Sequence, residues 1–213
     1  MAQDLIHFSC NECGVQNCQK KDSQYPAFCP TTTKVTAQEL EELNQIYAGG
    51  SVDGNMARTA ARIEAAYYCQ KTRVEETVLF IQQMGFQKVG IATCVGLLAE
   101  AKVFAKILKA NHINYYMVIC KVGGQDKCEM GLSDHEKVRG KGPETMCNPI
   151  LQARILNREH TDFNVAIGLC VGHDSLFYRH SEAPVTTLVA KDRVLAHNPV
   201  GALYSKYYKR LQD

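Results

Sequence analysis

Four cysteines lie close together near the start of the chain, with the spacing Cys-x2-Cys-x4-Cys-x10-Cys, and a proline follows the last of them directly. They are Cys10, Cys13, Cys18 and Cys29. Four soft sulfur ligands in one short, polar segment can enclose a tetrahedral metal ion or an iron–sulfur cluster without further ligands. The single Cys-x2-Cys pair and the Cys29-Pro30 dipeptide favour a [4Fe–4S] cluster. Zinc is the alternative, because spacing alone does not separate the two.

A second group of cysteines is expected at the ends of strands. Three short runs rich in apolar and β-branched residues end at Cys94, Cys120 and Cys170. The carboxyl ends of parallel strands share one edge of a sheet, where α/β proteins bind ligands, so we expect these thiols to meet in one crevice. Cys147 precedes a predicted helix and is expected to join them, and Cys128, in the long connection 121–146, is a candidate fifth ligand. We expect this set to bind a second cluster.

The packing alternative has to be weighed for each of these cysteines. A buried thiol is often just a small hydrophobic residue, and we interpret Cys69 in that way. For one strand-end cysteine the same interpretation would serve. The packing interpretation explains poorly why three equivalent strand ends all carry a cysteine. We therefore favour the interpretation that Cys94, Cys120 and Cys170 are ligands.

Two polar residues follow the third strand and are candidates for catalysis. His173 and Asp174 come just after Cys170 and could face the crevice as ligand, proton donor or hydrogen-bonding partner. Alternatively, Asp174 caps the next helix and His173 is polar lining. The phosphate-binding glycine loops, the nucleophile-elbow motif and the zinc-protease motif are all absent from the sequence.

The order of the predicted elements indicates an α/β protein with a doubly wound, mostly parallel sheet and flanking helices. Helices are expected from the Thr36 capping box to Gly49 and over 52–72, 73–84, 96–110, 149–159 and 204–211. Strands are expected over 88–94, 114–120, 163–170 and 185–190, with an extension at 194–196. We divide the chain into a cysteine-rich metal-binding segment, 1–34, and an α/β domain, 35–213, whose strand ends carry the second cysteine site.

Composition limits the classes of function. The 213 residues are 46% hydrophobic and 22% charged, with a net charge of +2 and no long basic stripe, which argues against a nucleic-acid binder. No stretch matches a signal peptide or a membrane span. We therefore expect a cytoplasmic protein, in which reduced thiols point to metal or redox chemistry and to a redox partner protein.

Three stretches resemble a known family. They are Cys-x2-Cys-Gly-Val-x2-Cys with the later Phe-Cys-Pro, Gly-Leu-Cys-Val-Gly-His-Asp-Ser-Leu-Phe around Cys170, and the run from Ala183 to Pro199. Together they resemble an uncharacterised prokaryotic family, the domain of unknown function 1847, over nearly the whole chain. The resemblance implies metal at the cysteines and adds no reaction.

Two functions follow from these observations. The first is a cytosolic iron–sulfur protein with two cysteine-ligated sites, acting in electron transfer or in a reductive reaction. The second is a non-redox protein with zinc at the amino terminus and a thiolate-lined pocket that binds or senses a small molecule or a metal. The sequence does not establish that the protein is an enzyme.

Overall fold

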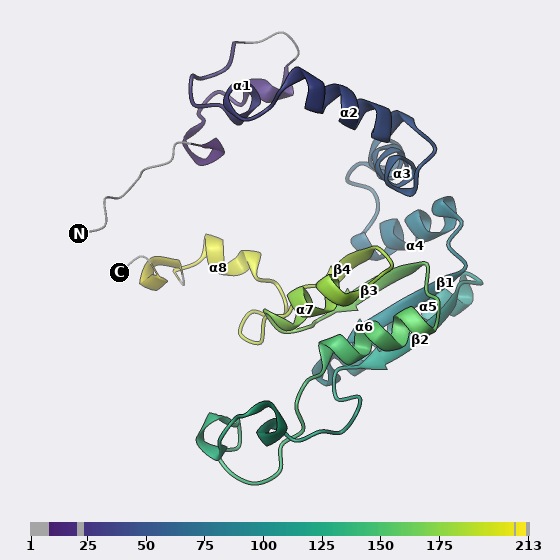
Figure 1. Ribbon diagram of the computed structural model, residues 1–213, viewed down its shortest axis with the longest axis vertical. Helices are drawn as coiled ribbons and strands as arrows, with labels where there is room; N and C mark the ends of the chain where they lie inside the picture. The colour runs from purple at the N-terminus through teal and green to yellow at the C-terminus, as the bar shows by residue number, and fades with distance from the viewer. Residues whose placement is uncertain (1–8, 21–23, 207, 212–213) are drawn as a thin grey trace. The chain divides into compact units, whose positions relative to one another are not determined.

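The computed structural model describes residues 9–20, 24–206 and 208–211 (Figure 1). The chain forms two compact units, residues 1–61 and 62–213. The first eight residues of the predicted cysteine-rich segment lie outside the described ranges. The predicted division of the chain at residues 34 and 35 stays a prediction.

The first unit is built from short elements. Two 3-10 turns, Cys10–Glu12 and Asn17–Gln19, precede α1 (Pro30–Thr33), α2 (Ala37–Ala48) and the start of α3 (Val52–Tyr67). The predicted capping box begins α2, because the Thr36 hydroxyl accepts from the Glu39 N–H at 3.2 Å and Glu39 accepts from the Thr36 N–H at 2.9 Å. Neither the two turns nor α1 or α2 contributes a buried residue.

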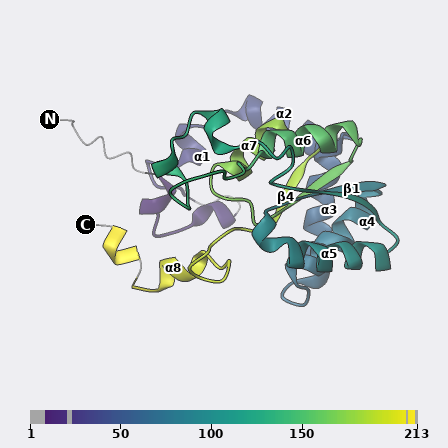
Figure 2. The ribbon, with the colours of Figure 1, turned by 90° about the horizontal axis from the view of Figure 1, so that it is seen from below.

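The second unit is the predicted α/β fold. Its elements are α4 (Arg73–Met84), β1 (Lys88–Thr93), α5 (Leu98–Ala110), β2 (Asn114–Ile119), α6 (Pro149–Arg158), β3 (Phe163–Ile167), α7 (His173–His180), β4 (Val185–Val189) and α8 (Val200–Tyr204). The strands form one parallel sheet in the order β2-β1-β3-β4. Figure 2 shows α6 and α7 on one side of this sheet and α4 and α5 on the other. The doubly wound α/β class is thus confirmed.

The strand order fixes where a ligand site should lie. From β1 the chain crosses over to β2 at one edge of the sheet, whereas β3 is followed by β4 at the opposite edge. The order of connections therefore reverses between β1 and β3. In open α/β sheets the crevice outside the carboxyl ends at this point is the usual place for a ligand.

The centre of the sheet is closely packed. Leu156 of α6 and Phe177 of α7, both with 0% exposure, cover Ala92 and Ala166 of the central strands. Gly90 pairs with Asn164 across β1 and β3, and a side chain at Gly90 would bring its Cβ to 1.9 Å from the Asn164 amide oxygen. The two central strands are therefore packed closely against each other and against α6 and α7, and their ends carry the cysteines.

Several boundaries differ from the expected ones. The strands β1, β2 and β3 end at Thr93, Ile119 and Ile167, just before the cysteines rather than at them. The helix expected to reach residue 72 ends at Tyr67. The extension expected at 194–196 is a turn, and the closing helix is two pieces, α8 and a 3-10 turn Tyr208–Leu211, with residue 207 outside the described ranges. None of the described helices is long and apolar enough to cross a membrane.

Candidate functional site

The four amino-terminal cysteines line a single cavity of about 340 Å³. The first 3-10 turn begins at Cys10, and Cys13 follows its end, while Cys18 lies within the second turn. Cys29 precedes α1, and its carbonyl accepts hydrogen bonds from the hydroxyls of Thr32 and Thr33 at 3.1 and 2.9 Å. Aromatic rings complete the wall, from Tyr25 and Phe28. Four cysteines spread over residues 10–29 thus line one cavity.

Three cysteines of the second group come together at the carboxyl edge of the sheet. Cys94 follows β1 and Cys120 follows β2, with 6% and 3% of their surfaces exposed. The side chain of Cys120 is hydrogen-bonded to both Cys94 and Cys147. Cys147 is held there because the next residue, Asn148, donates its N–H to the Cys120 carbonyl at 2.7 Å. We refer to Cys94, Cys120 and Cys147 as the crevice trio.

Backbone donors point at two sulfurs of the trio. The Val95 N–H lies 3.4 Å from the Cys120 sulfur, and the Gly96 N–H lies 3.5 Å from the Cys94 sulfur. Both donors belong to the 3-10 turn that directly follows Cys94. Such N–H···S bonds favour sulfur that carries negative charge.

Cationic side chains pair with the outer sulfurs of the trio. The hydrogen bond from Cys120, followed by that from Lys191 at 2.7 Å, lowers the pKa of Cys94 to about 4. The hydrogen bond from Cys120, followed by the charge of Lys121, lowers the pKa of Cys147 to about 5. The pKa of Cys120 is raised, because its thiol donates to Cys147 and Cys94 and is thereby favoured in its protonated form. These hydrogen bonds and cations therefore favour the charged forms of Cys94 and Cys147, and the same hydrogen bonds favour the protonated form of Cys120.

Cys170 lies on the loop between β3 and α7. The loop turns at Gly168 and Gly172, which have φ values of +63° and +83°. The guanidinium of Arg193 donates to the Cys170 sulfur at 3.0 Å. Cys170 therefore has a cationic partner of its own.

The two polar candidates after Cys170 have different surroundings. His173 is the first residue of α7, and its charged form would add to the lowering of the Cys147 pKa. Asp174 accepts hydrogen bonds from the N–H groups of Gly172 and Ser175, at 3.0 and 2.7 Å. Asp174 is the second residue of α7, and the N-cap position belongs to Gly172, so Asp174 binds backbone within the first turn and does not occupy the cap position.

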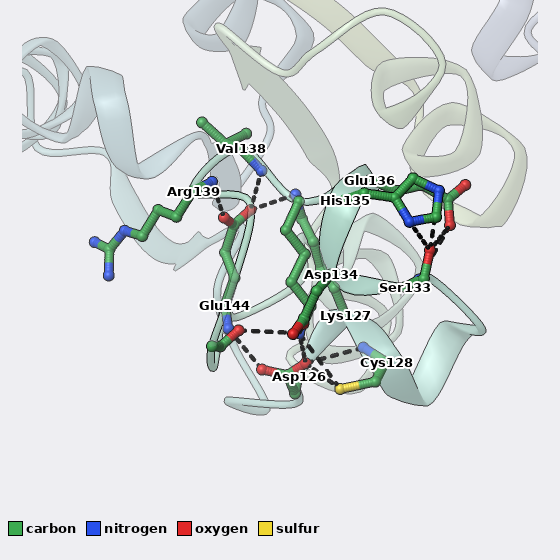
Figure 3. Close-up of polar contacts among 12 residues, drawn as sticks. Asp126, Lys127, Cys128, Ser133, Asp134, His135, Glu136, Val138, Arg139 and Glu144 are labelled. Carbon is green, nitrogen blue, oxygen red and sulfur yellow. Dashed lines mark hydrogen bonds and ion pairs between the residues drawn. The ribbon is translucent and has the colours of Figure 1, made fainter.

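Cys128 has partners inside the connection 121–146 rather than in the crevice (Figure 3). Its thiol donates to Asp126 at 2.5 Å, and the Lys137 ammonium lies 3.6 Å from its sulfur. The hydrogen bond from the Cys128 thiol, followed by backbone donors, lowers the pKa of Asp126. The structure therefore places Cys128 in a separate polar cluster.

Lys137 is the centre of that polar cluster. Only 3% of its side chain is exposed, and its ammonium contacts Asp134 at 2.9 Å, Asp126 at 3.2 Å and the Gly142 carbonyl at 3.0 Å. The two ends of the connection are joined as well, since the Lys127 N–H donates to the Glu144 carbonyl at 2.9 Å. The cluster thereby closes the loop whose ends carry Cys120 and Cys147.

We expect Lys137→Met to loosen this connection, because it removes the cation that neutralises Asp126 and Asp134 in a nearly buried position. Hydrogen–deuterium exchange should become roughly tenfold faster over 126–146. Lys141→Met, at an exposed position of the same connection, is the matched control and should leave exchange unchanged. Equal exchange in both variants would contradict the role given to Lys137.

Neither cysteine group has the geometry of a site for one ion. Within the described ranges, no three His, Cys, Asp or Glu side chains are arranged to hold a single metal ion. The donors of the first group surround a cavity, and those of the trio follow one another from Cys94 through Cys120 to Cys147. Both groups consist of sulfur donors, the ligand type that iron–sulfur clusters take from proteins.

Lys121, Lys191 and Arg193 are the residues that the sequence analysis missed. Two of them follow β4, and the sheet order alone brings the end of β4 next to the end of β3. A basic residue after a strand is common, and only the assumption that β4 is parallel to β3 could have drawn attention to them. The sequence pattern carried no stronger signal.

Two comparisons with known proteins place the chain in a family. A family model described as "Protein of unknown function (DUF1847)" matches residues 29–188, which include Cys29 and the strand-end cysteines. An uncharacterized protein of Methanocaldococcus jannaschii is 51% identical over 153 residues, which cover 72% of this chain and 77% of that protein. The chain therefore belongs to the DUF1847 family.

Proposed function

We propose that this protein is a cytosolic iron–sulfur protein with two cysteine-ligated centres, and that it acts in electron transfer or in a reductive reaction. The observation that carries the proposal is the cavity of about 340 Å³ lined by Cys10, Cys13, Cys18 and Cys29. Four thiols around one space form a complete ligand set for a [4Fe–4S] cluster.

The dimensions of the cavity support a cluster more than zinc. A structural zinc ion needs four sulfurs at about 2.3 Å from one point. The four amino-terminal cysteines instead line a cavity of about 340 Å³. An iron–sulfur cluster separates its ligands by its own width, and this arrangement suits it.

The crevice trio supports the second centre. Cys94, Cys120 and Cys147 are the proposed ligands, with Cys170 on the adjacent loop as the fourth. The N–H groups of Val95 and Gly96 would stabilise the sulfurs, as hydrogen bonds do around iron–sulfur clusters. Cys128 is left out of the proposed set because its thiol is bound to Asp126. When bound, such a cluster supplies an electron carrier at the ligand edge of the sheet.

The proposal is tested by purifying the full chain without oxygen and measuring iron, acid-labile sulfide and zinc, together with the visible spectrum. We expect about eight iron atoms and a similar amount of sulfide per chain, with broad absorption in the visible range. A colourless protein that contains zinc and no sulfide would overturn the proposal and support the non-redox alternative.

A further inference from the structure

The crevice has a cationic partner for three of its four sulfurs, and two of these partners come from one turn. Lys191 binds Cys94 at 2.7 Å, and Arg193 binds Cys170 at 3.0 Å. Both follow β4, on either side of Asp192 in the sequence. The third cation, Lys121, directly follows Cys120 in the sequence, and its charge lowers the pKa of Cys147.

The turn that carries Lys191 and Arg193 is constructed around Asp192. Its carboxylate accepts from the N–H groups of Val194 and Leu195 at 2.8 and 2.9 Å. Its N–H donates to His197 Nδ1 at 3.1 Å, and its carbonyl accepts from the His197 N–H at 2.9 Å. We refer to residues 191–197 as the Asp192 turn.

The backbone of the Asp192 turn is strained. Ala196 and His197 have φ values of +50° and +62°, a region that residues other than glycine seldom adopt. Two such residues in succession are maintained only where the surroundings fix them, which the contacts between Asp192 and His197 do here. The turn therefore holds its two cations in place at a cost in backbone energy.

The two cations oppose the charge of the crevice. Thiolates that lose contact with water are costly unless opposite charge or hydrogen bonds compensate them. Lys191 is half-buried, so its attraction to negative charge is less screened by salt than that of an exposed lysine. An electron added to a sulfur-ligated centre increases its negative charge, and nearby cations favour that reduced form.

We propose that Lys191 and Arg193, positioned by the Asp192 turn, are the charge-compensating residues of the crevice centre and raise its reduction potential. This inference rests on the proposed function. By this proposal the crevice centre accepts electrons, and the segment after β4 adjusts the potential of that centre in addition to completing the fold.

The test uses the full chain with both centres loaded and compares Lys191→Met, Arg193→Met and the double variant with wild type. Midpoint potentials are measured by redox titration followed by electron paramagnetic resonance. Each single variant should lower the potential of one centre, the double variant should lower it further, and the other centre should not change. Lys109→Met is the control, because Lys109 is exposed at the end of α5, on the opposite edge of the sheet.

Lys191→Arg keeps the charge and should restore most of the potential lost in Lys191→Met. If Lys191→Met loses the iron of the crevice, Lys191→Arg provides the test instead. Wild-type iron content and wild-type potential in Lys191→Arg would still support compensation by the positive charge. Unchanged potentials in variants that retain both centres would overturn this inference and leave the proposed function intact. A wild-type crevice without iron would overturn both, and the iron count reports that result before any potential is measured.

Discussion

Replacing Cys120 by alanine should remove the iron of the crevice centre and leave the amino-terminal centre loaded. Cys120 is the member of the trio that contacts both of the others, and it is almost fully buried between them. Without its sulfur, Cys94 and Cys147 lose their shared partner. We expect iron to fall from about eight to about four atoms per chain, with sulfide falling in parallel.

Cys69→Ser provides the control for Cys120→Ala, because it removes an exposed thiol outside both cysteine groups. Iron, sulfide and the visible spectrum are measured on both variants, and circular dichroism verifies that each is folded. Cys69→Ser should match wild type. Wild-type iron in folded Cys120→Ala would contradict the assignment of the trio as ligands.

The sheet could be predicted from the sequence because its strands are local features. Runs such as Lys88–Thr93 and Phe163–Ile167 are short, apolar and followed by glycine-containing loops, which is typical of buried parallel strands. The position of the crevice could be predicted from the topology of the sheet. Parallel strands place their carboxyl ends together, so the positions of Cys94 and Cys120 near each other could be expected before the structure was known.

The partners of these cysteines could not be predicted in the same way. Lys191 and Arg193 depend on the path of the chain after β4, where the Asp192 turn replaces the expected strand. Cys128 was expected near the crevice because it lies between Cys120 and Cys147 in sequence. The structure instead shows it bonded to Asp126, in a cluster that forms through ion pairs among residues of the connection. Such pairs leave no periodic signal in a sequence.

Cys13→Ser should have the largest effect on the first unit. Within its described residues, the turns and α1 bury no side chain, so packing contributes little to the order of residues 9–20 and 24–34. Metal ligation would then supply most of the free energy that orders this segment, as in other small metal-organised modules. Loss of one of four ligands should remove the centre and the order together.

The result expected for Cys13→Ser is cleavage of the segment by trypsin within minutes under conditions that leave the wild-type segment intact, with about four iron atoms remaining per chain. Asn11→Ser, an exposed change in the same turn, is the control and should resist cleavage as wild type does. The melting transition of the α/β unit should be unchanged, because its core is formed by the sheet and its helices. A segment that stays protected after the loss of its iron would show that ordering does not depend on the metal, and the four cysteines would then need another explanation.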